Sequence, residues 1–257
     1  MNAQRTDPFR WRFAGKSAWK TPHIASMTWR DGLFAHWPVE PDELRPHVPG
    51  RLRLETRDGR AWLSVLPFVL TNVGIRGTPS ITRLAFPELV VRTYVRYRDE
   101  SGLLYFSIDV GSSLVATAVG RTTGLPVYDA AMRVSATEEN HVTFTSDRQG
   151  PSTAGDRPAR FAATYRPDGD AFTAEPGTLE YWLTARRRFY APESKGILTG
   201  EIAHDPWPLQ PAAVTIHENT LFEANGLPTP IGEPVFQYAD ELSMTGSIPR
   251  RVGRVGT

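Results

Sequence analysis

The stretch Leu-Val-Val-Arg-Thr-Tyr-Val-Arg-Tyr at residues 89–97 decides the fold class of this chain. It is rich in β-branched and aromatic residues with polar residues interspersed, which is typical of a strand, and Asp99-Glu100-Ser101-Gly102 then supplies a turn. Residues 103–110, Leu-Leu-Tyr-Phe-Ser-Ile-Asp-Val, continue as the returning strand of a hairpin. The segment therefore predicts antiparallel β-structure.

Strand patterns of the same kind recur on both sides of this hairpin. We expect further strands at residues 25–29, 52–56, 62–70, 128–136, 141–146, 160–165, 188–191, 197–204, 213–221 and 234–243. Helices are fewer and are expected at residues 40–45, 112–123 and 177–186. A succession of strands with short connections and three interposed helices predicts a mainly β, closed or strongly curled sheet that helices plug.

The composition excludes several classes of protein. The 257 residues suffice for one continuous core, and 29 basic against 28 acidic side chains give a net charge of +1, which provides no field for nucleic-acid binding. The absence of cysteine removes disulfides, thiolate nucleophiles and cysteine-ligated metals. We expect a flexible arm at residues 1–22, a single domain at 23–252 and a tail at 253–257, with the chain loosely held from residue 247.

No segment has the pattern of a targeting or membrane sequence. The N-terminus is polar and carries no apolar run of signal-peptide length. The most apolar stretch, residues 61–70, is interrupted by Ser64 and Pro67 and is too short to span a bilayer. We therefore expect a cytoplasmic protein with no membrane partner and no nucleic-acid partner.

A row of ionisable side chains follows one face of the strand that opens the hairpin. Glu88, Val90 and Arg92 alternate on that face, and Tyr94 and Arg96 continue it. Charges on a strand inside a curled sheet must be paired or must face a wet cavity, because burial of an unpaired charge is prohibitive. The row thus has two interpretations. It could be structural, as a salt-bridge ladder or an exposed face, or it could line a pocket for a small carboxylate or enolate.

Five segments at ordered spacing resemble the YqjF-like family of uncharacterised bacterial and archaeal proteins. They are residues 29–38 (Trp-Arg-Asp-Gly-Leu-Phe-Ala-His-Trp-Pro), 58–62, 86–95 (Phe-Pro-Glu-Leu-Val-Val-Arg-Thr-Tyr-Val), 124–128 and 207–211. The resemblance covers roughly residues 25–252. It implies the acetoacetate-decarboxylase-like fold, a cone-shaped, mostly antiparallel β-barrel that encloses a small-molecule cavity.

The resemblance also implies where the site lies. Arg30 matches an active-site arginine of the decarboxylases, and Glu88 takes the place of their cavity glutamate. Their Schiff-base motif is Gly-Phe-Pro followed by two lysines, whereas here Gly124-Leu125-Pro126 is followed by Val127 and Tyr128. Schiff-base chemistry needs an amine, which these two residues do not offer.

The whole chain has only three lysines, and none of them matches the motif. Lys16 and Lys20 fall in the expected arm, and Lys195 falls in a turn-like segment. We therefore expect any activity to be independent of lysine. No phosphate-binding loop or dinucleotide motif is present and the six histidines are scattered, so we expect no cofactor and no metal.

Glu88 and Tyr128 are the candidate catalytic residues, and Arg30, Arg92 and His36 are the candidate ligand-binding residues. Each has a structural alternative. Arg30 could simply pair with Glu88, and Tyr128 could fill the volume that two lysines vacated.

Two neighbouring residues have roles that the strand geometry constrains. His36 and Trp37 point to opposite sides of their strand, so only one can face the cavity. Asp109, at the end of the returning strand, is expected to cap the helix that follows Ser112.

Three functions remain open. The first is a lyase-like or isomerase-like enzyme acting on a small carbonyl or carboxylate compound through Arg30, Glu88 and Tyr128. The second is a non-catalytic barrel that sequesters or senses a small molecule such as an organic acid. The third is a structural subunit with a filled cavity, and the resemblance does imply large homo-oligomers. An open cavity touched by Arg30, Glu88 and Tyr128 together would favour the first two.

Overall fold

The fold is described from a computed structural model that covers residues 21–148, 158–193 and 196–252. The expected arm at 1–22 therefore lies almost wholly outside the described residues, and the tail at 253–257 lies entirely outside them.

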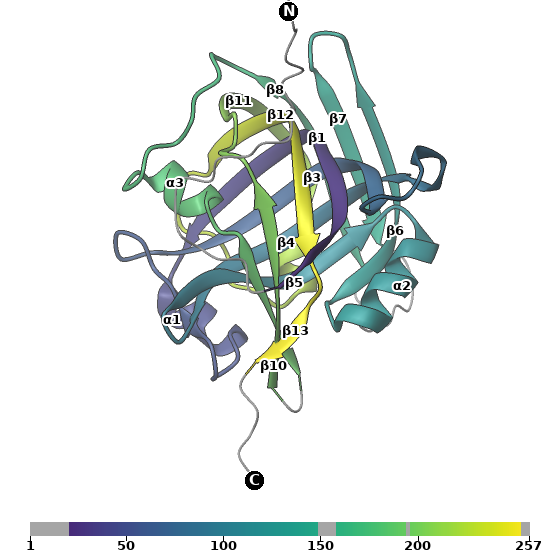
Figure 1. Ribbon diagram of the computed structural model, residues 1–257. Coiled ribbons are helices and arrows are strands. Elements are labelled where there is room, and N and C mark those ends of the chain that lie inside the picture. Colours follow the sequence, from purple (N-terminus) through teal and green to yellow (C-terminus); the bar gives the residue numbers. More distant parts are fainter. Residues whose placement is uncertain (1–20, 149–157, 194–195, 253–257) are drawn as a thin grey trace, which may run out of the picture.

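Strands dominate the described chain (Figure 1). They are β1 (His23–Val39), β2 (Arg53–Leu54), β3 (Ala61–Ile75), β4 (Leu84–Tyr97), β5 (Glu100–Val110), β6 (Val127–Ala136), β7 (Val142–Arg148), β8 (Ala159–Pro167), β9 (Arg188–Glu193), β10 (Gly196–His204), β11 (Gln210–Asn219), β12 (Val235–Ser247) and β13 (Arg250–Val252). The helices are α1 (Pro41–Leu44), α2 (Ser113–Thr123), α3 (Leu179–Thr184) and α4 (Leu221–Ala224), with short 3-10 turns η1 (Arg45–His47) and η2 (Ser80–Thr82).

All expected strands and helices are present, with shifted ends. Two expectations were wrong in detail. The chain is not loose from residue 247, because β13 forms a ladder with β10 in which Ile197 lies opposite Val252. The strand expected to reach residue 221 ends at Asn219, and a one-turn helix, α4, buries Leu221 instead.

The strand pairings close into a ring. In order around it, β12 pairs with β1, β1 with β3, β3 with β4, β4 with β5, β5 with β9, β9 with β10, and β10 again with β12. The neighbours are antiparallel except β5 with β9. The remaining long strands β6, β7, β8 and β11 form a second arc from β5 back to β12. The prediction of a closed, mostly antiparallel sheet is confirmed.

The shared strands separate two cores because successive side chains point to opposite faces. Leu33, Ala35 and Trp37 of β1 face one core, where they pack with side chains of β7 and β8 such as Phe144. Phe34 faces the other core, inside the ring. Figure 1 shows α2 beside β6 and α3 on the other side of the molecule.

An irregularity in β1 changes which residues face the ring interior. Arg30 lies opposite Val69 but Ala35 lies opposite Val65, so β1 has one more residue than β3 between these pairs. The extra residue is a β-bulge, and Asp31 within it adopts a φ of 50°. The bulge reverses the alternation, so that Trp29 before it and Phe34 after it both face the interior.

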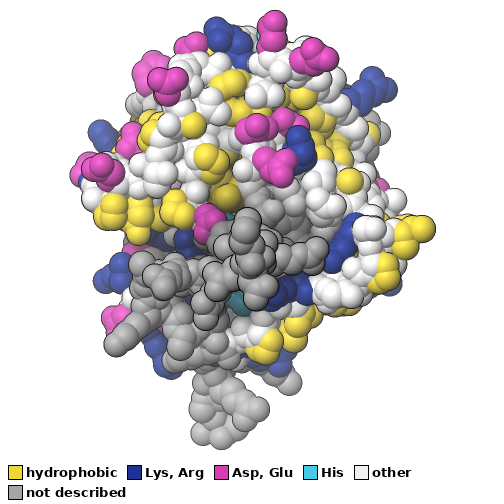
Figure 2. Space-filling model, turned by 45° about the horizontal axis from the view of Figure 1, so that its top comes forward, with side chains coloured by type: hydrophobic (Ala, Val, Ile, Leu, Met, Phe, Trp, Pro, Cys, Tyr) yellow, Lys and Arg dark blue, Asp and Glu magenta, His cyan; other side chains and the backbone are white. Residues whose placement is uncertain are grey.

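In the described part of the chain, no helix has the length and apolar character needed to cross a membrane. Figure 2 shows basic, acidic and hydrophobic side chains interspersed over the described residues of one face. This mixture agrees with the near-zero net charge of the sequence.

Candidate functional site: a cavity inside the strand ring

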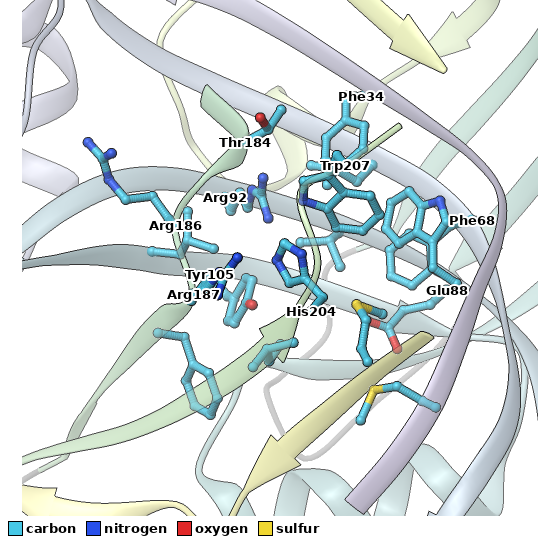
Figure 3. A pocket seen from close by; sticks show the side chains of 18 of the residues that line it. Phe34, Phe68, Glu88, Arg92, Tyr105, Thr184, Arg186, Arg187, His204 and Trp207 are labelled. Atoms are coloured by element: carbon cyan, nitrogen blue, oxygen red, sulfur yellow. The ribbon is translucent and has the colours of Figure 1, made fainter. Parts of the chain in front are cut away.

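A cavity of about 100 Å³ lies inside the ring, and every strand of the ring contributes to its wall (Figure 3). The lining side chains are Met27, Trp29 and Phe34 of β1, Leu66, Phe68 and Leu70 of β3, Glu88, Val90 and Arg92 of β4, Leu103 and Tyr105 of β5, Arg188 and Phe189 of β9, Ile202 and His204 of β10 and Met244 of β12, with Thr184, Arg186, Arg187 and Trp207 between these strands. The predicted row Glu88, Val90, Arg92 therefore faces a cavity.

Glu88 is a carboxyl group without a cation beside it. It lies opposite Phe68 in the β3–β4 ladder, and it forms no ion pair with any residue that the structure describes. Burial disfavours the charged form, and it raises the pKa of Glu88 to about 8. The group therefore carries its proton at neutral pH, when it can donate a hydrogen bond or a proton.

Arg92 is a buried cation without a carboxylate partner among the described residues. Its Nη2 lies 3.5 Å from the carbonyl oxygen of Leu183, and its Nε has no hydrogen-bond acceptor there. Arg187 also lines the cavity and forms no ion pair within the described chain. Two guanidinium groups in one cavity thus keep donors for an anion.

The two other arginines of the lining have carboxylate partners. Arg186 donates to Glu55 at 3.0 Å, and Arg188 pairs with both Glu100 and Glu201. The surplus of positive charge in the cavity therefore belongs to Arg92 and Arg187.

His204 is held as a neutral imidazole. Its Nδ1 lies 2.5 Å from the backbone carbonyl oxygen of Asp205, which can only accept, so Nδ1 carries the proton and Nε2 keeps its lone pair. The pKa of His204 is lowered to about 4, chiefly by burial; the hydrogen bond to Asp205 opposes this shift, and the positive charges of Arg187 and Arg92 add to it. The ring also packs against Trp207, with 4.8 Å between the ring centroids.

Tyr105 lies opposite Arg92 in the β4–β5 ladder and lines the same cavity. Burial raises the pKa of its hydroxyl to about 12, with opposite contributions from Arg92 and Glu88. The hydroxyl therefore stays protonated and can donate to a ligand oxygen.

Aromatic rings form the opposite end of the cavity. Trp29 stacks on Phe68 at 4.0 Å and 17° and on Phe34 at 5.1 Å and 16°. Trp207 meets Trp29 edge to face at 4.9 Å. The indole Nε1 of Trp29 donates to the carbonyl oxygen of Ala239 at 3.0 Å, so its polar atom is already satisfied.

His36 lies on the same side of β1 as Phe34 but does not line the cavity. Its Nδ1 is 2.7 Å from the hydroxyl of Ser64, which is 2.8 Å from that of Tyr94, and Tyr94 donates to the carbonyl oxygen of Leu183 at 2.9 Å. This buried chain ends on the carbonyl that Arg92 also approaches, so His36 lies behind Arg92. Trp37 points to the opposite side, as the alternation predicts, and packs on Phe222.

The structure does not bring Arg30, Glu88 and Tyr128 together in one cavity, because only Glu88 of the three lines the cavity inside the ring. Arg30 precedes the bulge and follows the inward-facing Trp29, so its side chain points outward. It forms an ion pair with Glu241 at 2.6 Å and is 45% exposed.

Tyr128 belongs to a different buried cluster. The guanidinium of Arg148 lies 4.0 Å from the centroid of its ring, and Arg148 pairs with Asp109 at 2.6 Å. The expectation that Asp109 caps α2 was also wrong, because its carboxylate is engaged by Arg148, and Ser112 forms no side-chain cap.

Three groups of this cavity, Tyr105, Arg187 and His204, escaped the sequence reasoning, and so did the aromatic Trp207. Tyr105 has the same strand character as its neighbours, and only the register shows that it faces Arg92. Arg187 lies in the run Arg186-Arg187-Arg188, an unusual cluster immediately before a strand that could have signalled an anion site.

The described lining residues include no lysine. Lys16, Lys20 and Lys195 lie outside the described residues. Within the described ranges, no three His, Asp or Glu side chains come together as a group that could hold a metal ion.

Residues 26–243 match the DUF2071 family, described as an uncharacterized conserved protein. The chain is also 41% identical over 217 residues to the uncharacterized protein YqjF of Bacillus subtilis (strain 168), covering 84% of this chain and 87% of that protein. The chain therefore belongs to the DUF2071 family, and its resemblance to YqjF is confirmed.

Solved structures share the fold at low sequence identity. The enduracididine biosynthesis enzyme MppR, in complex with pyruvate, superposes with a TM-score of 0.65 and 14% identity over 93% of this chain and 94% of that chain. An acetoacetate decarboxylase gives a TM-score of 0.60 and 13% identity over 92% and 93%. A decarboxylase-like enzyme from Sphingomonas wittichii RW1 gives 0.58 and 12% over 91% and 94%. The fold is thus acetoacetate-decarboxylase-like, as predicted.

Proposed function

We propose that this member of the DUF2071 family binds a small organic acid with a carbonyl group in the cavity, and that it moves a proton on that acid without a lysine Schiff base. The reaction is isomerase-like or lyase-like. Arg92 and Arg187 bind the carboxylate, and Glu88, His204 and Tyr105 act on the rest of the molecule.

The observation that carries the proposal is the pair of guanidinium groups, buried Arg92 and half-buried Arg187, that have no carboxylate partner among the described residues. An uncompensated buried cation such as Arg92 is costly to a fold unless an anion joins it. A ligand carboxylate supplies that anion and accepts charge-assisted hydrogen bonds. The neutral state of Glu88 at pH 7 avoids repulsion of such a ligand.

The protonation states of Glu88 and His204 support proton transfer in the direction from an enol to its keto acid. Glu88 holds a proton that it can donate to the carbon of an enol, while Nε2 of His204 accepts the proton of the enol hydroxyl. One proton is gained at carbon and one is lost at oxygen, so the enol becomes the keto acid with no net change. Tyr105 donates a hydrogen bond to the oxygen throughout. The same donation by Glu88 would quench the carbanion left by a lyase reaction.

A related fold offers chemical support. MppR was crystallised with pyruvate, which is a small organic acid with a carbonyl group. Because the two sequences are only 14% identical, the MppR complex supports only the class of ligand that such a barrel can hold. The binding role in this protein is assigned from the residues of its own cavity.

Binding is tested by thermal unfolding with a panel of small 2-oxo acids and their uncharged amides. The acids should raise the melting temperature and the amides should not, since a ligand of the folded state stabilises by mass action. A panel in which amides and acids act equally would contradict the role of the arginines.

Catalysis is tested by following, by NMR in D₂O, the conversion of the enol of a 2-oxo acid to its keto form. The protein should accelerate this conversion and place deuterium on the carbon next to the carbonyl, and Glu88→Gln should abolish the acceleration while keeping binding. Binding without acceleration in the wild type would favour the second function, a non-catalytic barrel that sequesters or senses the acid.

The lysine-independent route has its own test. Borohydride reduction in the presence of the acid should leave the mass of the protein unchanged, because no imine forms. A reduced adduct on Lys16, Lys20 or Lys195 would overturn this part of the proposal.

A further inference from the structure

We infer that the ligand of this cavity is a 2-oxo acid with an aromatic or similarly bulky apolar group beyond its carbonyl, such as phenylpyruvate, in preference to pyruvate itself. The inference rests on the proposed function and specifies its substrate class. It comes from the division of the cavity into a cationic end and an aromatic end.

The two ends are separated along β4. Arg92 follows Glu88 by four residues, which corresponds to about 13 Å between their Cα atoms at the rise of a strand. Figure 3 shows the arginines on one side of the cavity, Phe68 and Glu88 on the other, and His204 between them. A ligand whose carboxylate is bound at Arg92 and that extends along the strand therefore passes Val90 on its way toward Glu88.

Apolar side chains line part of this path. Val90 lies between Glu88 and Arg92 on the same face, and Trp207 and Phe68 also line the cavity. A two- or three-carbon acid held at Arg92 would leave these surfaces without a partner. A phenyl group attached beyond the carbonyl would cover them.

The aromatic end is preformed. The ring of Trp29 lies over Gly32, where a Cβ atom would come within 1.9 Å of the indole, so only glycine permits this position. Its Nε1 is bonded to Ala239, and Phe68 stacks on it at 4.0 Å. The wall therefore loses little side-chain freedom when an aromatic ligand binds, which favours affinity.

The test is calorimetric titration of the full-length protein with phenylpyruvate and with pyruvate. We expect phenylpyruvate to bind at least about tenfold more tightly, because a buried aromatic ring adds apolar contact that a methyl group cannot. Equal affinity, or tighter binding of pyruvate, would overturn this inference but leave the proposed function intact. If neither acid binds, the proposed function fails as well.

A pair of tryptophan variants assigns the preference to the cavity. Trp207→Leu should bring the ratio of the two affinities to within about threefold. Trp37→Leu removes an equally buried tryptophan from the other core and should leave the ratio as in the wild type. If both variants keep the wild-type ratio, or both lose it, the aromatic end is not the source of the preference.

The variants must be compared as folded proteins. Each is therefore titrated only below its own melting temperature. If Trp207→Leu does not fold, Phe68→Leu replaces it, because this side chain lines the same end and the same loss of preference is expected.

Discussion

Two buried arginines of this protein, Arg148 and Arg92, have opposite surroundings. Arg148 is 1% exposed, pairs with Asp109 at 2.6 Å and lies over the ring of Tyr128. Arg92 is 9% exposed and has no carboxylate partner among the described residues. Arg148 is compensated by a carboxylate from within the chain, whereas Arg92 has no carboxylate partner among the described residues and faces a cavity.

This difference separates a structural charge from one that is available to a ligand. A fold can retain a buried cation because its own residues neutralise it or because something that binds does so. The Asp109–Arg148 pair is balanced in charge without a ligand, so we assign it to stability. Arg92 has no such carboxylate, so we assign it to binding. The following changes test the two assignments.

The largest effect is expected from Asp109→Asn. The change removes the carboxylate and leaves the Arg148 cation buried without its partner, which typically costs about 3–5 kcal/mol. The free energy of unfolding in urea should fall by this amount, with little change in acid binding by the protein that remains folded. A loss below about 1 kcal/mol would mean that Arg148 is compensated in another way.

The second change is Arg92→Met, which keeps the volume and removes the charge. We expect stability to stay constant or to rise, because an uncompensated cation is lost, while acid binding weakens by about 10–150-fold, the equivalent of one charged hydrogen-bonding partner. Calorimetry with the acid and urea unfolding measure the two quantities on the same sample.

Arg186→Gln is the matched control for Arg92→Met. Arg186 lines the same cavity but is already paired with Glu55, so its removal should change acid affinity by less than about threefold. If the two variants weaken binding equally, the absence of a partner is not what distinguishes Arg92.

The third test is the pH dependence of acid binding. Glu88 is protonated below its pKa of about 8, and above this pH its negative charge repels a bound anion. Affinity should be constant from pH 6 to 7 and should fall above pH 8 by up to about tenfold per unit. Glu88→Gln cannot ionise, so its affinity should stay constant over the same range. A wild-type profile that is flat to pH 10 would contradict a neutral Glu88.

The same group contributes to stability with a defined sign. In the unfolded chain Glu88 loses its proton near pH 4.5, but in the folded protein it keeps it to about pH 8. The folded state thus binds more protons between these values, so this contribution to stability is largest at acid pH and is lost as the pH rises to about 8. Glu88→Gln should remove it.

The smallest effect is expected from Arg30→Gln. This exposed pair with Glu241 should contribute at most about 1 kcal/mol, and acid affinity should not change, because Arg30 points away from the cavity. A marked loss of acid binding in this variant would contradict the outward position of Arg30. It would mean that Arg30 contributes to the site, as its match to the active-site arginine of the decarboxylases implies.

Local alternation was sufficient to place two of the polar residues of the cavity on one face of β4. The period of two along residues 88–92 placed Glu88 and Arg92 on one face, and the curled sheet turned that face toward a cavity. The position of Arg30 could not be predicted in this way. The bulge at Asp31 reverses the alternation, and a backbone φ of 50° leaves little trace in a single sequence.

The remaining site residues depend on pairings between distant segments. Tyr128 and Tyr105 both lie in strand-like stretches of the sequence. Tyr105 lies opposite Arg92 in the β4–β5 ladder, whereas Tyr128 lies opposite Asp109 in the β5–β6 ladder and its ring packs on Arg148. Such registers are set by how the ring closes, through contacts such as those of β5 with β9. His204 and Trp207 reach the cavity for the same reason, and neither has a local pattern that indicates it.

The central claim is that the cavity is completed by an anion at Arg92. The most direct measurement is a crystal structure of the protein grown with a 2-oxo acid that raises its melting temperature. We predict that the carboxylate lies within hydrogen-bond distance of Arg92 and Arg187, with the apolar group against Trp207 and Phe68. A carboxylate bound at Arg30, or a cavity that holds no acid under saturating conditions, would contradict the claim.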